Sequence, residues 1–167
     1  MTEASETLNS RAFRNALGTF PTGVAVVTTC TAHGRPVGLT VNSFSSLSLD
    51  PPLILWSLKV NSPSLPTFDH SPYFAVNILA EDQVKMSKRF AASRPRKFAK
   101  LELRAGVGGV PLLAGCAAHL ECRRVGRHNG GDHVLYIGHV EQVAYDRTKR
   151  PLVFYSGKYL SAGNAIP

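Results

Sequence analysis

Two short segments hold side chains that could bind a polar ligand without reacting with it. The first, NSFSSLS at residues 42–48, offers one amide and four hydroxyls just before a break at Asp50-Pro51-Pro52. Small donors of this kind can hold a planar polar ring without crowding it. An ordinary polar turn is the alternative, because Asn and Ser are common turn residues.

The second segment places a histidine where a ligand could reach it. Gly131-Asp132-His133 follows a glycine-rich turn and opens a strand pattern, so the imidazole of His133 would lie at the rim of a sheet. An imidazole can donate, accept and titrate near neutral pH, which suits contact with a polar cofactor. A surface histidine beside a turn is the alternative, and this segment by itself favours it.

Eight basic side chains gather between residues 85 and 104, against one acid, Glu102. The whole chain carries a formal net charge of +8, from 19 Lys+Arg and 11 Asp+Glu. The basic segment could form a cradle for phosphate or simply a solvated surface. Nucleic-acid binding would need aromatic rings between the basic residues, whereas the setting of Phe90 and Phe98 is typical of the core. We therefore expect no nucleic-acid partner.

Other reactive constellations fail on spacing. Cys116 and Cys122 would share one face of a strand with His119 on the other, and the two thiols would lie ~20 Å apart, so we expect free cysteines and no metal site. The segment 106–111, GVGGVP, starts like a dinucleotide-binding loop but lacks its last glycine and its flanking strand and helix. The sequence also has no GxxxxGK[ST] loop and no GxSxG motif.

The element expected first along the chain is a short helix. Its N-cap would be Ser10, and it would end between Gly18 and Pro21. The spacing i, i+3, i+4 and i+7 gives it one apolar face, formed by Phe13, Ala16, Leu17 and Phe20.

The remaining pattern predicts about seven closely spaced strands and one or two further helices. A helix is predicted from Glu81 to Phe90, and residues 61–68 form a loop or a helical turn. Because strands do not alternate regularly with helices, a closed or partly closed antiparallel barrel fits better than a parallel sheet. The predicted strands cover residues 24–31, 37–41, 53–58, 73–79, 117–127, 133–145 and 152–155.

Length and composition predict a single domain over residues 1–167, with residues 1–9 as a disordered tail. No apolar run approaches the ~18 residues of a membrane span. The N-terminal residues lack the basic and apolar regions of a signal peptide. We therefore expect a cytoplasmic protein with no membrane association.

Taken in order, five segments resemble the flavin reductase-like family with an FMN-binding split barrel. The resemblance spans residues 13–160 and implies a mainly β fold, an antiparallel Greek-key split β-barrel with two or three short helices. The segments are FRNALGTFPTGVAVVTT, GLTVNSFSSLSLDPPLILWSL, YFAVNILAEDQVKMSKRFA, GDHVLYIGHV and PLVFYSGKY.

The resemblance also implies a reaction: hydride transfer from NADH, with NADPH as a further candidate, to FAD or FMN, which then serves a partner monooxygenase. Family members of this kind are homodimers. His133 would face the nicotinamide as the catalytic residue. The implied flavin-binding residues are Thr22, Gly23, Thr40, Val41, Asn42, Ser43, Ser45, Ser46, Asn61, Ser62, Ser64, Arg89, Phe90 and Tyr159.

A second function stays open at this point, because split barrels host several functions. The chain could be a flavin-binding electron carrier, or a haem- or flavin-binding protein, without nicotinamide turnover. The sequence also leaves open FAD against FMN and NADH against NADPH. The basic segment favours acceptance of FAD, since it could serve a second phosphate.

Overall fold

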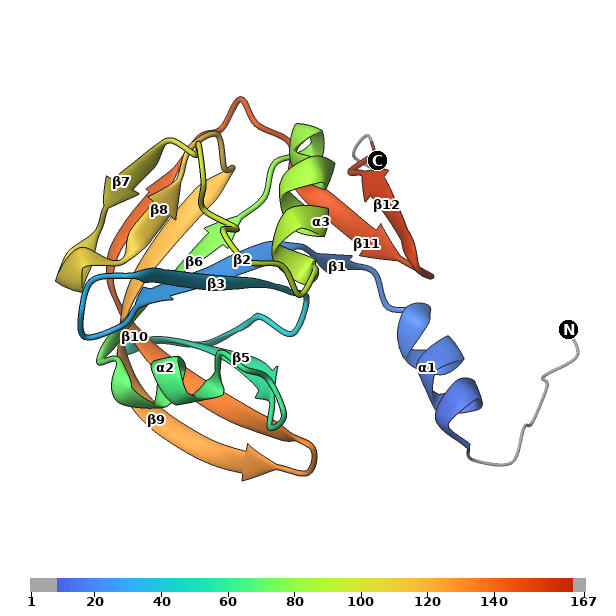
Figure 1. Cartoon of the computed structure of the whole chain (residues 1–167). Helices are drawn as coiled ribbons and strands as arrows, with labels where there is room; N and C mark the ends of the chain where they lie inside the picture. The colour runs from blue at the N-terminus through green and yellow to red at the C-terminus, as the bar shows by residue number, and fades with distance from the viewer. Residues whose placement is uncertain (1–8, 164–167) are drawn as a thin grey trace, which may run out of the picture.

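The computed structural model describes residues 9–163, and strands dominate it (Figure 1). The helices are α1 (Ser10–Gly18), α2 (Leu65–His70) and α3 (Val84–Ala91), with 3-10 turns η1 (Glu81–Gln83) and η2 (Val107–Gly109). The strands are β1 (Thr22–Gly23), β2 (Ala25–Cys30), β3 (Pro36–Val41), β4 (Ser45–Leu49), β5 (Pro52–Lys59), β6 (Tyr73–Ile78), β7 (Leu103–Ala105), β8 (Pro111–Leu113), β9 (Ala118–Gly130), β10 (His133–Tyr145), β11 (Leu152–Tyr155) and β12 (Lys158–Ser161).

The main sheet has seven antiparallel strands in the order β3-β2-β6-β9-β10-β5-β4. Its two edge strands, β3 and β4, are consecutive in the chain and are separated only by residues 42–44. The sheet therefore curls until its edges approach, but the edges do not pair. This is a split barrel, as the family resemblance implies.

The barrel interior is filled by alternate residues of facing strands. On β5, Ile54, Trp56 and Leu58 point inward, and on β10 Tyr136 stacks on Trp56 with ring centroids 4.9 Å apart. Gly138 is required here, because a Cβ at this position would lie 2.4 Å from the Phe74 ring. A tightly packed aromatic core of this kind fixes the register of β5 against β10.

A second apolar cluster holds α3 and the small β1-β11-β12 sheet against the barrel. Phe90 of α3 is fully buried and meets the Phe98 ring edge-to-face at 4.9 Å. Phe90 is a core residue, as its setting in the sequence predicts, and Phe98 is partly buried against the same cluster. The polypeptide after α3 is thereby anchored beside β3.

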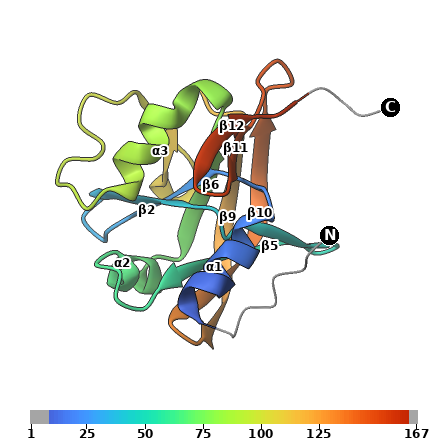
Figure 2. The ribbon, with the colours of Figure 1, turned by 90° about the vertical axis from the view of Figure 1, so that its right-hand side faces the viewer.

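Helix α1 stands away from the barrel (Figures 1 and 2). The helix buries none of its residues, and its apolar side chains are 55% (Phe13) and 58% (Leu17) exposed. Phe20, just beyond it, is 74% exposed. The predicted apolar face therefore exists but covers nothing within the described residues.

The structure corrects several details of the predicted elements. The N-cap of α1 is Asn9, whose side chain accepts from the Arg11 and Ala12 N–H groups, rather than Ser10. The rest of the predicted tail, residues 1–8, lies outside the described residues. The polar segment 42–48 runs into a strand, β4, and the seven predicted strands are joined by short ones, β1, β7, β8 and β12. No helix within residues 9–163 is long and apolar enough to cross a membrane.

Candidate functional site

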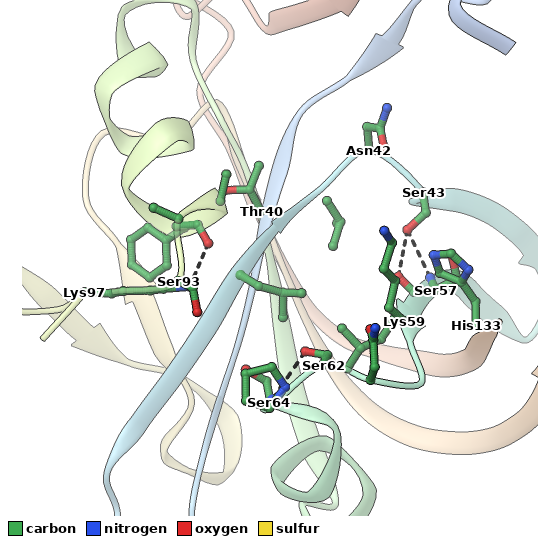
Figure 3. A pocket seen from close by; sticks show the side chains of 18 residues that line it. Thr40, Asn42, Ser43, Ser57, Lys59, Ser62, Ser64, Ser93, Lys97 and His133 are labelled. Atoms are coloured by element: carbon green, nitrogen blue, oxygen red, sulfur yellow. Dashed lines mark hydrogen bonds between the residues drawn. The ribbon is translucent and has the colours of Figure 1, made fainter. Parts of the chain in front are cut away.

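A cavity of about 510 Å³ opens where the barrel is split (Figure 3). One wall is the end of edge strand β3, the other the end of β5 and the loop after it, and the start of the segment after α3 closes one side. Its lining residues are Leu39, Thr40, Val41, Asn42, Ser43, Ser57, Leu58, Lys59, Asn61, Ser62, Pro63, Ser64, Phe90, Ala91, Ala92, Ser93, Lys97 and His133.

Ser43 ties the two walls together across the split. Its Oγ donates to the Ser57 carbonyl at 3.0 Å and accepts from the Ser57 N–H at 3.1 Å. Strand β4 pairs only with Pro52–Leu55 of β5, so the next part of β5 has no strand on that side. A single hydroxyl thus takes the place of strand pairing at this point and satisfies the backbone groups of Ser57.

One end of the cavity carries an oriented histidine. The Nδ1 atom of His133 lies 2.7 Å from Asp132 Oδ1, and because a carboxylate only accepts, Nδ1 donates the proton. The pKa of Asp132 is held below its ordinary value mainly by this hydrogen bond. Lys59 is the direct partner of His133 in the β5–β10 register. This end therefore combines a fixed imidazole with a cation.

The opposite end carries a second cation, Lys97 (Figure 3). Its Nζ donates to the carbonyls of Phe90 at 2.8 Å and Gly38 at 3.4 Å. Partial burial lowers the pKa of Lys97. Within the described part of the chain no carboxylate pairs with it. A half-buried ammonium without a counter-charge favours an anionic group from a ligand.

Between the two ends the lining is neutral and small. Ser62 and Ser64 lie on the floor in Figure 3, and Asn42 stands at the rim. Among the residues that the structure describes, no Asp, Glu or Cys lines the cavity. The lining therefore suits a ligand with a planar polar body and an anionic tail, and it offers no side-chain nucleophile of the Cys or carboxylate type.

Comparison with known proteins shows the family of this chain. The family described as "Flavin reductase like domain" matches residues 17–163. The chain belongs to this family. The resemblance inferred from the five sequence segments is thereby confirmed.

Relatives of this flavin reductase-like domain cover nearly its whole length. An Agrobacterium fabrum protein named FMN reductase (NADH) SmoA is 46% identical over 90% of this chain and 85% of its own. The Rhodococcus jostii protein HsaB, named the reductase subunit of a flavin-dependent monooxygenase, is 41% identical over 93% and 80%.

A solved relative has the same fold. The Streptomyces globisporus NADH:FAD oxidoreductase SgcE6, crystallised with NAD and FAD fragments, superposes with a TM-score of 0.89 at 33% identity. The match covers 95% of this chain and 98% of that one.

Nine residues singled out from the sequence are brought together by this flavin reductase-like fold. They are Thr40, Val41, Asn42, Ser43, Asn61, Ser62, Ser64, Phe90 and His133, and all line the cavity. Phe90 can contribute only its backbone, because its ring is in the core. Their predicted contacts with a flavin stay predictions.

Six other predicted site residues lie outside the lining of this cavity. They are Thr22, Gly23, Ser45, Ser46, Arg89 and Tyr159. Arg89 donates to the carbonyls of Lys97 and Ala99, so it shapes the segment after α3. Tyr159 lies 2.9 Å from the Ser87 hydroxyl, and the Ser87 carbonyl accepts from Thr40 at 2.7 Å. Tyr159 therefore reaches a cavity wall through α3 and not directly.

Sequence reasoning missed three lining residues that carry charge or shape. Lys59 lies at the cavity because it pairs with His133 in the β5–β10 register. The sequence pattern of one strand does not show which residue of another strand lies opposite. Ser57 takes part through its backbone N–H and carbonyl, which bind Ser43. Lys97 could not be told apart from the seven other basic residues of its segment. The sequence could have singled out Lys97 by its position next to Phe98, because Phe98 packs against an apolar cluster and holds this segment beside it.

The predicted cysteine roles are also resolved in part. Cys116 and Cys122 are free and buried, in different apolar clusters, and burial raises the pKa of each thiol to about 12. His119 is partly buried, and its Nε2 lies 2.8 Å from the Leu113 carbonyl. Within residues 9–163 no group of three or more His, Cys, Asp or Glu side chains could hold a metal ion.

Proposed function

We propose that the protein is a flavin reductase that takes a hydride from NADH to FAD or FMN and supplies the reduced flavin to a partner monooxygenase. The observation that carries the proposal is the cavity at the barrel split, with His133 at one end and Lys97 at the other. Within residues 9–163 no acid lines this cavity and no carboxylate pairs with Lys97. When bound, the flavin supplies the redox chemistry, and the protein supplies binding, orientation and electrostatics.

The lining fits a flavin in both shape and donor set. Asn42, Ser62 and Ser64 offer small neutral donors for the ring system and its polyol chain. Lys97 supplies a positive charge for the phosphate and has no carboxylate that would compete for it. Because the charge of Lys97 attracts the phosphate, the flavin lies with its phosphate at the Lys97 end of the cavity. Its ring system then lies at the His133 end.

His133 positions the nicotinamide in this proposal. Asp132 holds the ring through Nδ1, which leaves Nε2 to face the ligand. The main structural demand of the reaction is a close approach of the two ring systems, roughly 3–3.5 Å between reacting atoms. A fixed imidazole at the mouth of the cavity can hold the nicotinamide close to the flavin ring without forming a covalent bond.

The protein acts as a single-domain cytoplasmic homodimer in this proposal. Helix α1 has nine residues, too short to be stable alone in water, and its Phe13 and Leu17 side chains are exposed. A second copy of the chain is the occupant that would cover this face. Names of relatives support the reaction itself, since SmoA is named an NADH-dependent FMN reductase and SgcE6 an NADH:FAD oxidoreductase.

A steady-state assay tests the proposal. NADH absorbance should fall only when riboflavin, FMN or FAD is added with the protein, and addition of a flavin-dependent monooxygenase should couple that loss to substrate oxidation. A protein that binds flavin but never consumes NADH or NADPH would instead be an electron carrier, and the proposal would be wrong.

A further inference from the structure

The cavity at the split has a cation at each end, and the two would meet different parts of a flavin (Figure 3). Lys97 lies at the end that receives the phosphate in the proposed function. Lys59 lies beside His133, at the end that receives the ring system. Lys59 is thus a charged group of the cavity that phosphate binding does not explain.

The backbone that carries Lys59 is held from both sides. Lys59 pairs with His133 in the β5–β10 register, and its carbonyl accepts from the Ser62 N–H at 3.0 Å. The next N–H along the chain, that of Val60, donates to the Asp132 carbonyl at 3.0 Å. The ammonium of Lys59 is therefore tethered at the ring end of the cavity.

No carboxylate of the described chain neutralises this cation directly. Within residues 9–163 Lys59 forms no ion pair. Asp132 adjoins this end, but it is 84% exposed, is bonded to His133 and does not line the cavity. A ring bound in the cavity would exclude water from Lys59 and not from Asp132, so water would screen the carboxylate more strongly. The positive charge therefore dominates at the ring.

The ring system is the part of a flavin whose charge changes in the reaction. A hydride carries two electrons and one proton from NADH to the neutral oxidised ring, and it leaves NAD⁺ and a reduced ring with one negative charge. The phosphate has the same charge before and after this transfer. A cation at the ring end therefore favours the reduced flavin, whereas a cation at the phosphate end favours both forms equally.

We propose that Lys59 makes the protein bind reduced flavin more tightly than oxidised flavin, because its ammonium lies against the ring. The inference deepens the proposed function and rests on it, since that function places the ring at the His133 end. Tighter binding of the reduced form keeps the product in the cavity until it is transferred to a monooxygenase.

Anaerobic calorimetry with oxidised FMN and with photochemically reduced FMN, both without NADH, tests the inference. The wild type should bind the reduced form several-fold more tightly than the oxidised form. Lys59→Gln should lower the ratio of the two dissociation constants about fivefold, the order of a partly exposed ion pair, and should change the affinity for oxidised FMN by less than about twofold. Lys59→Arg should keep the wild-type ratio, because arginine keeps the charge.

Riboflavin, which lacks the phosphate, separates the two cations. Lys59→Gln should lower the ratio of dissociation constants for riboflavin as much as for FMN. Lys97→Gln should weaken both redox forms of FMN by the same factor and leave both forms of riboflavin unchanged. The matched control is Lys149→Gln, which removes the same charge from the turn beyond the far end of β10 and should change none of these constants.

Four results would overturn the inference. The first is a wild type that binds both redox forms with equal affinity, and the second is a Lys59→Gln variant with the wild-type ratio. The third is an equal loss of oxidised and reduced FMN in Lys59→Gln, which would place the phosphate at Lys59. The fourth is a changed riboflavin ratio in Lys97→Gln, which would place the ring at Lys97.

These results are distinct from failure of the proposed function. That failure would appear as no binding of riboflavin or FMN by the wild type and no flavin-dependent loss of NADH, and it would remove the inference as well. Flavin binding and turnover without a Lys59-dependent preference for the reduced form would leave the reductase proposal intact and remove only the role of Lys59.

Discussion

In the proposed function, Asp132 would act on the ligand only through His133. Its side chain is 84% exposed and accepts from the Nδ1 of His133, which is itself 33% exposed. We expect Asp132→Asn to slow NADH-dependent flavin reduction several-fold, because the imidazole loses its fixed orientation. Rapid-mixing kinetics measure the rate, and flavin titration should show unchanged affinity.

The matched control is Asp146→Asn, another exposed aspartate in a turn, bonded to Thr148. It should leave the reduction rate unchanged. His133→Ala should slow reduction more than Asp132→Asn while also sparing flavin affinity. If Asp132→Asn reduces flavin as fast as the wild type, Asp132 has no positioning role.

Ser43 has a structural role besides the flavin contact proposed for it. Removing its hydroxyl leaves the N–H and carbonyl of Ser57 without partners at an open sheet edge. We expect Ser43→Ala to lower the free energy of unfolding by about 1–2 kcal/mol, measured by urea denaturation. Ser46→Ala, at an exposed position on β4, should change it by only a few tenths of a kcal/mol. Equal effects of the two variants would contradict the bridging role.

At the scale of elements, Asp69 joins α2 to the two longest strands. Its carboxylate accepts from Arg127 of β9 at 2.8 Å and from the Tyr136 hydroxyl of β10 at 2.6 Å. Burial by itself would raise the pKa of Asp69, but these hydrogen bonds outweigh it and hold the pKa below its ordinary 3.8. The ionised carboxylate is thus favoured in the folded state.

This shift gives stability a pH dependence with a definite sign. The contribution of Asp69 is complete above pH 3.8, the ordinary value of the carboxyl, and is lost as the pH falls through the lower pKa of the folded state. We expect Asp69→Asn to cost about 1–2 kcal/mol at neutral pH. Urea denaturation of both proteins should show the difference shrinking below pH 3.8, and a difference that stays constant with pH would contradict this role.

Helix α1 makes a prediction about assembly. Replacing Phe13 and Leu17 by Ser removes most of its exposed apolar surface, so we expect a dimer to dissociate toward monomer in sedimentation experiments. Arg11→Ser/Asn15→Ser alters the opposite face of the same helix and should leave the dimer intact. A wild type that sediments as a monomer, or a dimer unaffected by the first pair, would contradict the proposed contact.

At the scale of the molecule, the long, strongly patterned elements could be predicted from the sequence and the short ones could not. The alternation of β5 and the length of β9 and β10 leave a clear pattern, whereas the two residues of β1 and the three of β7 leave none. The cap of α1 was misplaced by one residue because both Asn9 and Ser10 are good N-caps.

The site residues that lie together in one segment of the sequence could be predicted. Those that reach the cavity through contacts between different strands could not. Residues 40–43 and 61–64 and His133 line the cavity, as the family resemblance implied for most of them. Lys59 and Ser57 enter it through the β5–β10 register and the Ser43 bridge. The net charge of +8 likewise does not show by itself which basic residues lie at a cavity: of the 19, Lys59 and Lys97 line the cavity at the split.

Anaerobic rapid mixing of NADH with the protein and FAD tests the central claim most directly. The account predicts loss of the visible flavin absorption, much faster than in the same mixture without protein. It also predicts that deuterium at the transferred position of NADH slows this loss, because a hydride moves in the measured step. Flavin that keeps its colour, or loses it no faster with the protein than without, would contradict the account.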